Sequence, residues 1–136
     1  MDVALVGLVD ARGWVLLQER DEYAPTDPDR WSLVGGGIES GERPDAAARR
    51  ELEEETTLVH DGLRLLGDVV LPCDLHGEDR FFVFRGETAA TDDDVECREG
   101  RQIVFVDPAA ADALDLTRAT RALLPQVLDG RGFAAT

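Results

Sequence analysis

The sequence predicts an α/β fold in which a mixed β-sheet is sandwiched between α-helices. Two observations lead to this prediction. Six apolar runs rich in β-branched and aromatic residues indicate strands, and helical segments interrupt them at only two places. The length of 136 residues, with 43% hydrophobic residues, fits a single domain over residues 1–136 with a core of its own.

The first three strands are expected before residue 35. Apolar segments at 2–10 and 14–20 flank a turn at 10–13 and therefore predict a β-hairpin. A polar loop with two prolines follows at 21–30. The short strand WSLV at 31–34 then leads directly into three consecutive glycines.

A helix is expected after the glycines. Pro44 suits its first turn, where a missing N–H costs nothing, and Asp45 places negative charge at the N-terminal end. We expect this helix to end near Thr56.

Three more strands and two helices complete the predicted order. The strand segments are LRLLGDVVL at 63–71, RFFVFRG at 80–86 and RQIVFVDP at 101–108. Pro108 is expected to open a short helix, and residues 117–130 to form a C-terminal helix that Pro125 kinks or restarts.

The composition excludes several classes of protein. The net charge of -15 argues against binding the phosphate backbone of nucleic acids, which requires clustered Lys and Arg. No apolar run approaches the ~18–20 residues of a membrane span. The acid at position 2 and the lack of a basic start argue against a signal peptide, so the sequence predicts a cytoplasmic protein.

Cysteine and histidine are scarce. Neither the two cysteines, Cys73 and Cys97, nor the two histidines, His60 and His76, have the spacing of a zinc site. We therefore expect both cysteines to be ordinary reduced thiols.

The predicted helix carries an unusual cluster of carboxylates. Glu51, Glu54 and Glu55 share one helical face, where like charges cost about 0.2–0.5 kcal/mol per pair. They also lie in the second half of the helix, where the helix dipole disfavours negative charge. Local stability therefore does not explain the cluster, although a solvated acidic face does account for Glu53 alone.

A bound cation is the other explanation for the cluster. Carboxylates without a neighbouring His or Cys make a hard oxygen site suited to Mg²⁺, or to Mn²⁺ in its place. Such an ion would also let an acidic protein hold a polyphosphate. The glycines before the helix fit this site because backbone without Cβ can approach a ligand closely, although a plain tight turn is the alternative.

The spacing of these residues resembles the Nudix box. Gly36, five residues, Glu42, seven residues and then RELEEETTL at 50–58 follow the pattern Gly-x5-Glu-x7-Arg-Glu-U-x-Glu-Glu-x-Gly-U, in which U is a bulky aliphatic residue. The match covers 23 residues, and the flanking segments resemble short MutT-like members. The resemblance implies the Nudix fold, an α/β/α sandwich. It also implies hydrolysis of a nucleoside diphosphate linked to another moiety.

The resemblance also implies roles for individual residues. The implied metal ligands are the carboxylates of Glu51, Glu54 and Glu55 and the carbonyl oxygen of Gly35. Arg50 would hold the carboxylates in place, and Glu42 would have a structural role. Gly36 and Gly37 are candidate substrate-binding positions for a separate reason, because backbone without Cβ can approach a ligand closely.

The general base is expected to be Glu51. The alternative is an acid in the later segment 92–101, which offers Glu96 and Glu99. Glu99 is favoured because it lies just before the strand, although a solvated loop acid explains it equally well.

Further substrate contacts are expected outside the box. Arg20 ends the second strand, where similar proteins place a phosphate contact, and a surface arginine is the alternative. Tyr23 is a candidate for stacking on a base. Trp31 and Phe82 fit core packing better, and the polar loop at 76–80 is a further candidate.

Two departures from the box are visible. Thr57 replaces a glycine that ends the helix in a left-handed conformation, which β-branched residues adopt poorly, so we expect the following loop to differ. Val34 replaces a common proline. The metal ligands lie upstream of Thr57, so the chemistry is expected to survive.

The identity of the substrate stays open at this stage. Nucleoside triphosphates, nucleotide sugars, ADP-ribose and dinucleoside polyphosphates all fit a small-molecule nucleotide, and relatives that pair suggest a homodimer. A second hypothesis is a catalytically silent nucleotide-binding or sensor domain. Such domains are expected to lose box carboxylates, and this sequence keeps all of them.

Overall fold

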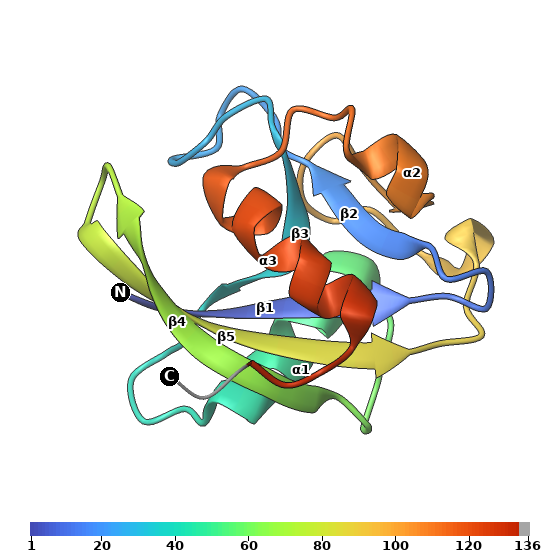
Figure 1. Cartoon of the computed structure of the whole chain (residues 1–136), viewed down its shortest axis with the longest axis horizontal. Coiled ribbons are helices and arrows are strands. Elements are labelled where there is room, and N and C mark those ends of the chain that lie inside the picture. The colour runs from blue at the N-terminus through green and yellow to red at the C-terminus, as the bar shows by residue number, and fades with distance from the viewer. Residues whose placement is uncertain (134–136) are drawn as a thin grey trace.

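A computed structural model describes residues 1–133 and confirms the α/β class (Figure 1). One six-stranded mixed sheet carries helices on both faces. The strands are β1 (Asp2–Val9), β2 (Val15–Glu19), β3 (Trp31–Gly37), β4 (Arg64–Cys73), β5 (Gly77–Glu87) and β6 (Gln102–Val106). The helices are α1 (Pro44–Thr56), the 3-10 helix η1 (Asp92–Asp94), α2 (Pro108–Ala111) and α3 (Arg118–Asp129).

The strand order is β4-β5-β1-β3-β2-β6, with β1 near the middle. β1 runs parallel to β5 from Asp2↔Arg80 to Val9↔Glu87 and antiparallel to β3. The predicted hairpin is paired only next to its turn, at Val9↔Val15, and β1 and β2 separate beyond this point. Strand β1 therefore has a hydrogen-bonded neighbour on each side, β3 on one and β5 on the other.

Helix α1 covers one face of the sheet and has the predicted bounds. Its apolar residues Ala47, Ala48 and Leu52 are fully buried against a core that includes Ala4 and Val6 of β1. Alanine side chains let the helix axis lie close to the sheet. The carboxylates after Ala48 are thereby held near the glycines of β3, as the contacts below show.

Helix α3 covers the opposite face (Figure 1). Leu123, Leu124 and Val127 pack there into a second core with residues of β1, β2, β3 and β5. The helix does not restart at Pro125, because one helix runs through this residue. Pro125 and Arg121, whose carbonyl loses its helical donor, both lie on the exposed side of the helix.

Thr57 ends α1 in the conformation that the box glycine would adopt. Its φ is +68°, and its N–H donates to the Glu53 carbonyl oxygen at 2.9 Å. A β-branched residue therefore takes the left-handed conformation here, although such residues adopt it poorly. In the described part of the chain, no helix combines the length and apolar character required to cross a bilayer.

Candidate active site

A hollow with a volume of about 790 Å³ lies where Gly35–Gly37 of β3 meet Glu51 and Glu55 of α1. Its wall is formed by β1, β3, the C-terminal half of α1, the loop before β3, the β4–β5 turn, the loop before β6 and the start of α3. The site residues predicted from sequence that line it are Arg20, Gly35, Gly36, Gly37, Glu51, Glu55 and Glu99.

Glu55 is the most deeply buried acid of this cavity, with 3% of its surface exposed. The backbone N–H of Gly35 donates to its carboxylate at 3.3 Å. Burial, followed by the adjacent carboxyls of Glu99 and Glu51, raises the pKa of Glu55 to about 10. Without a cation nearby, this carboxyl is therefore neutral at physiological pH.

Glu51 lies directly beneath the glycine backbone. A Cβ on Gly36 would stand 2.6 Å from the Glu51 carboxyl carbon, so only glycine leaves room for this carboxylate. Burial raises the pKa of Glu51, while the Arg50 guanidinium opposes this shift. Glu51 is thereby placed between a cationic side chain and the cavity.

Arg50 binds the acids around it. Its guanidinium donates to both carboxylate oxygens of Glu42 at 2.8 and 2.9 Å, to Glu51 at 3.0 Å and to Glu54 at 3.2 Å. A fifth bond of 3.1 Å reaches the carbonyl oxygen of Gly37. Hydrogen bonding from Arg50 and from the Glu39 N–H lowers the pKa of Glu42 to about 2, so this carboxylate remains ionised.

Glu54 occupies the outer end of the cluster. Its side chain is 58% exposed, and it contacts Arg50 without lining the cavity in the described part of the chain. Glu53 is exposed, which agrees with the solvated role expected of it.

The segment before β6 places Glu99 next to the acids of α1 that line the cavity. The N–H groups of Glu96 and Arg98 donate to the carbonyl oxygens of Thr56 and Glu55 at 3.1 and 2.9 Å, which satisfies carbonyls left open at the helix end. Gln18 donates to the Glu99 carbonyl oxygen at 2.8 Å. Glu96 itself is 65% exposed and contacts Arg98, so the structure brings Glu99 to the cavity and leaves Glu96 outside.

The two predicted substrate contacts in the first half of the chain have different positions. Arg20 lines the cavity, but its guanidinium donates to the carbonyl oxygens of Thr26 and Asp27 and so holds the neighbouring loop. Tyr23 is 84% exposed and is not among the described residues that line the cavity. Trp31 and Phe82 pack against the two cores, as expected.

The cavity also contains residues that the sequence did not suggest. Arg30 and Arg118 line it, and Arg118 begins α3 next to the cap residue Thr117. Only the tertiary fold brings these two arginines to one cavity, so no sequence motif could have identified them. The β4–β5 turn adds Cys73, which was also not suggested, together with His76 and Asp79 of the polar loop that the sequence did offer as a candidate.

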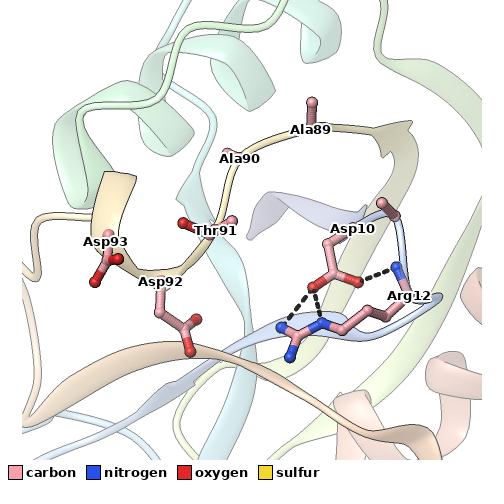
Figure 2. A pocket seen from close by; sticks show the side chains of 8 residues that line it. Asp10, Arg12, Ala89, Ala90, Thr91, Asp92 and Asp93 are labelled. Atoms are coloured by element: carbon pink, nitrogen blue, oxygen red, sulfur yellow. Dashed lines mark hydrogen bonds and ion pairs between the residues drawn. The ribbon is translucent and has the colours of Figure 1, made fainter.

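A smaller hollow of about 380 Å³ lies elsewhere, beside the β1–β2 turn. Figure 2 shows Arg12 turned back onto Asp10, with bonds of 2.8 and 3.0 Å. Arg12 also stacks over Trp14, and Asp92 accepts from the Phe105 N–H at 2.8 Å. The polar groups named here already have partners within the protein, so they have a structural role and this hollow is not proposed as a ligand site.

Comparison with known proteins agrees with the geometry. A family model described as the NUDIX domain matches residues 1–127. An RNA pyrophosphohydrolase of Rhodospirillum rubrum is 44% identical over 48 residues, 35% of this chain and 27% of that protein. The nucleoside triphosphatase NudI of Escherichia coli is 44% identical over 48 residues, 35% of this chain and 34% of that protein. The matches thus span about a third or less of these curated relatives.

Solved structures share the fold over nearly the whole chain. A MutT protein from Methanosarcina mazei gives a TM-score of 0.79 at 20% identity, covering 96% of this chain and 93% of that one. The Escherichia coli dihydroneopterin triphosphate pyrophosphohydrolase gives 0.76 at 24% identity, covering 95% of each chain. The NUDIX domain of Shewanella oneidensis NrtR, complexed with ADP ribose, gives 0.79 at 18% identity, covering 96% of this chain and 87% of that one.

Proposed function

The chain belongs to the NUDIX family, and we propose that it is a Mg²⁺-dependent pyrophosphohydrolase. Its substrate would be a nucleoside diphosphate linked to another moiety, and the bond cleaved would lie in the diphosphate. The observation that carries the proposal is the buried carboxyl of Glu55 at the wall of the large cavity, next to Glu51 and Glu99.

The residues around Glu55 fit a divalent cation. The donors are carboxylates, together with the carbonyl oxygen of Gly35, and such a hard oxygen set suits Mg²⁺ or Mn²⁺. A buried acid whose pKa is raised to about 10 is unfavourable when ionised, and a cation offsets that cost. When bound, the ion would neutralise phosphoryl oxygens and acidify a water molecule.

The charge around the cavity fits a polyphosphate that arrives with its cation. The acids Glu51, Glu55 and Glu99 form one part of the wall, and Arg20, Arg30 and Arg118 contribute positive charge. The N-terminal end of α3, at 117–120, also lines the cavity and favours anions. The net charge of -15 supports a small nucleotide rather than an extended nucleic acid as the substrate.

Glu51 is the proposed general base. Burial raises the pKa of Glu51, which moves it toward the range in which a base takes a proton from water effectively. Its hydrogen bond to Arg50 fixes one side of the carboxylate. Glu99, beside Glu55, is the second candidate.

A sensor domain is the second candidate function. Its support is the fold shared with the NrtR domain that was solved with ADP ribose. The enzyme is favoured because this chain retains all the box carboxylates and buries one of them within the cavity.

The test is release of phosphate or pyrophosphate with and without Mg²⁺ or Mn²⁺. The panel comprises nucleoside triphosphates, dihydroneopterin triphosphate, nucleotide sugars, ADP-ribose, dinucleoside polyphosphates and 5′-triphosphate RNA. Glu55→Gln should abolish turnover, whereas Glu53→Gln, a change on the same helix at an exposed position, should not affect it. If no substrate is cleaved but Mg²⁺ and a nucleotide together raise the melting temperature, the sensor function replaces the enzyme.

A further inference from the structure

Three potential metal ligands meet at the turn of the β4–β5 hairpin, outside the box. Cys73 Sγ lies 3.4 Å from His76 Nδ1, and the same nitrogen lies 3.1 Å from Asp79 Oδ1. The three ligand atoms all lie within 4.8 Å of one another. Among the described residues 1–133, this is the only group of three such side chains that meets this distance.

The hairpin geometry explains why these residues converge. Cys73 pairs with Gly77 and Leu71 pairs with Asp79, so Cys73 and Asp79 project from the same face of the two-stranded ribbon. The chain reverses at 74–76, aided by the positive φ of Gly77, and this turn brings His76 over that face. The turn therefore brings the side chains of the Cys-x2-His-x2-Asp segment together on one face of the hairpin.

Hydrogen bonding alone explains the arrangement poorly. Both Cys73 and Asp79 approach the same ring nitrogen, which either donates one proton or accepts one. A Cys-His-Asp catalytic triad would use both ring nitrogens, so this is not a nucleophile with its base. Asp79 is 7% exposed, and the Met1 ammonium approaches its Oδ1 at the longer distance of 3.5 Å.

Two of the three ligand separations match those around a tetrahedral metal ion, and the third, between Cys73 Sγ and a carboxylate oxygen of Asp79, is within 4.8 Å. Zinc bonds of about 2.3 Å to sulfur and about 2.0 Å to nitrogen and oxygen hold sulfur and nitrogen about 3.5 Å apart, and nitrogen and oxygen about 3.3 Å apart. The observed separations are 3.4 and 3.1 Å. We propose that Cys73, His76 and Asp79 form a three-ligand zinc site.

This site differs in chemistry from the box. A thiolate and an imidazole select Zn²⁺ over Mg²⁺, whereas the box offers oxygen donors only. Three protein ligands leave a fourth position open, and all three residues line the cavity that also contains Glu51 and Glu55. A bound zinc ion would thus add a second positive centre to this cavity, and its binding does not depend on the hydrolase reaction.

The test uses Co²⁺ as a spectroscopic substitute for zinc in the chelator-treated, reduced protein. We expect a thiolate-to-cobalt absorption band that saturates at about one ion per chain and disappears when Zn²⁺ is added. Cys73→Ser should abolish the band, and His76→Ala should weaken Zn²⁺ binding by at least about tenfold. Cys97→Ser and His60→Ala are matched controls. They should leave the cobalt band and the affinity for Zn²⁺ unchanged, because these residues lie outside the cluster.

A measurement on the unaltered chain covers the case in which a variant does not fold. Zn²⁺ should slow the alkylation of Cys73 without protecting Cys97. Mass spectrometry of the two cysteine-containing peptides measures both rates. The proposal is wrong if no thiolate band forms, if the band survives Cys73→Ser in a folded protein, or if zinc protects both cysteines equally. Glu55→Gln should retain the band, so failure of the hydrolase proposal would not affect this result.

Discussion

The carboxylate of Glu51 occupies the space in which a side chain on Gly36 would lie, because its carboxyl carbon is only 2.6 Å from the point where a Cβ would stand. Gly36→Ala should therefore displace Glu51 and lower the metal-dependent kcat by about a hundredfold. Gly132→Ala is the control, because a Cβ there meets its nearest neighbour at an ordinary 3.5 Å. Equal activity of the two variants in a hydrolysis assay would show that Glu51 need not occupy this position.

The buried Glu55 should make the metal-free protein less stable as pH rises. The pKa of this carboxyl is raised from 4.5 to about 10 in the folded chain, so the folded state binds the proton more tightly than the unfolded state. The resulting stabilisation is complete below pH 4.5 and is lost as pH rises toward 10, by as much as about 1.4 kcal/mol per pH unit. Urea unfolding across this range in chelator measures the slope.

Two comparisons assign that slope to Glu55. Glu55→Gln should flatten the pH dependence, and Glu53→Gln should leave it as it is. Saturating Mg²⁺ should restore stability at high pH, because only the ionised carboxylate binds the cation. A slope that is unchanged in Glu55→Gln would assign the dependence to other groups.

Thr57→Gly should stabilise the protein by about 1 kcal/mol, because the left-handed conformation at φ +68° strains a β-branched residue and suits glycine. Thr57→Asn should give a smaller gain, since asparagine tolerates this conformation better than threonine. The measurement is chemical unfolding of the three proteins. The idea of strain fails if threonine proves the most stable of them.

Arg50→Lys should reduce activity by about a hundredfold, although it preserves the charge. A lysine ammonium cannot reproduce the two-pronged contact with Glu42 while also reaching Glu51 and Glu54. Arg49→Lys is the matched control, because the ion pair recorded for Arg49 among the described residues joins it to the half-buried Asp45, away from Glu51 and Glu54. Similar kinetics for both variants would contradict the positioning role of Arg50.

Glu99→Gln should lower kcat by about a hundredfold or more if Glu99 assists proton transfer or cation binding. Glu96→Gln, three residues earlier and outside the cavity, should have little effect. Calorimetric titration of Mg²⁺ separates the two roles, because only the loss of a ligand weakens cation binding. Full activity in Glu99→Gln would leave Glu51 as the general base.

The parts of this protein that sequence predicted well are those determined by neighbouring residues. Pro44 marks the first turn of α1, and helical spacing alone places Glu51 and Glu55 on one side. Contacts between distant segments could not be predicted in this way. Nothing in the sequence near Arg118 indicates that it shares a cavity with Arg30.

Two other features of the structure could not be read from the sequence, for separate physical reasons. Tyr23 is a candidate for stacking on the substrate, but it belongs to a loop whose backbone is bound by Arg20, and its side chain lies outside the cavity. Cys73 and His76 lack the familiar spacing of zinc sites, and the hairpin turn nevertheless brings them together with Asp79. Combining the ligand spacing with a tight turn between the two predicted strands would have detected this cluster.

The central position of β1 has a consequence for how the chain folds. This first strand pairs in parallel with residues 80–87, so its sheet edge stays open until the second half of the chain is available. Pairings between such distant segments make folding slow, because a long loop must close before its contacts form. During synthesis, the unpaired apolar edge of β1 would be the segment of this domain most in need of protection from aggregation.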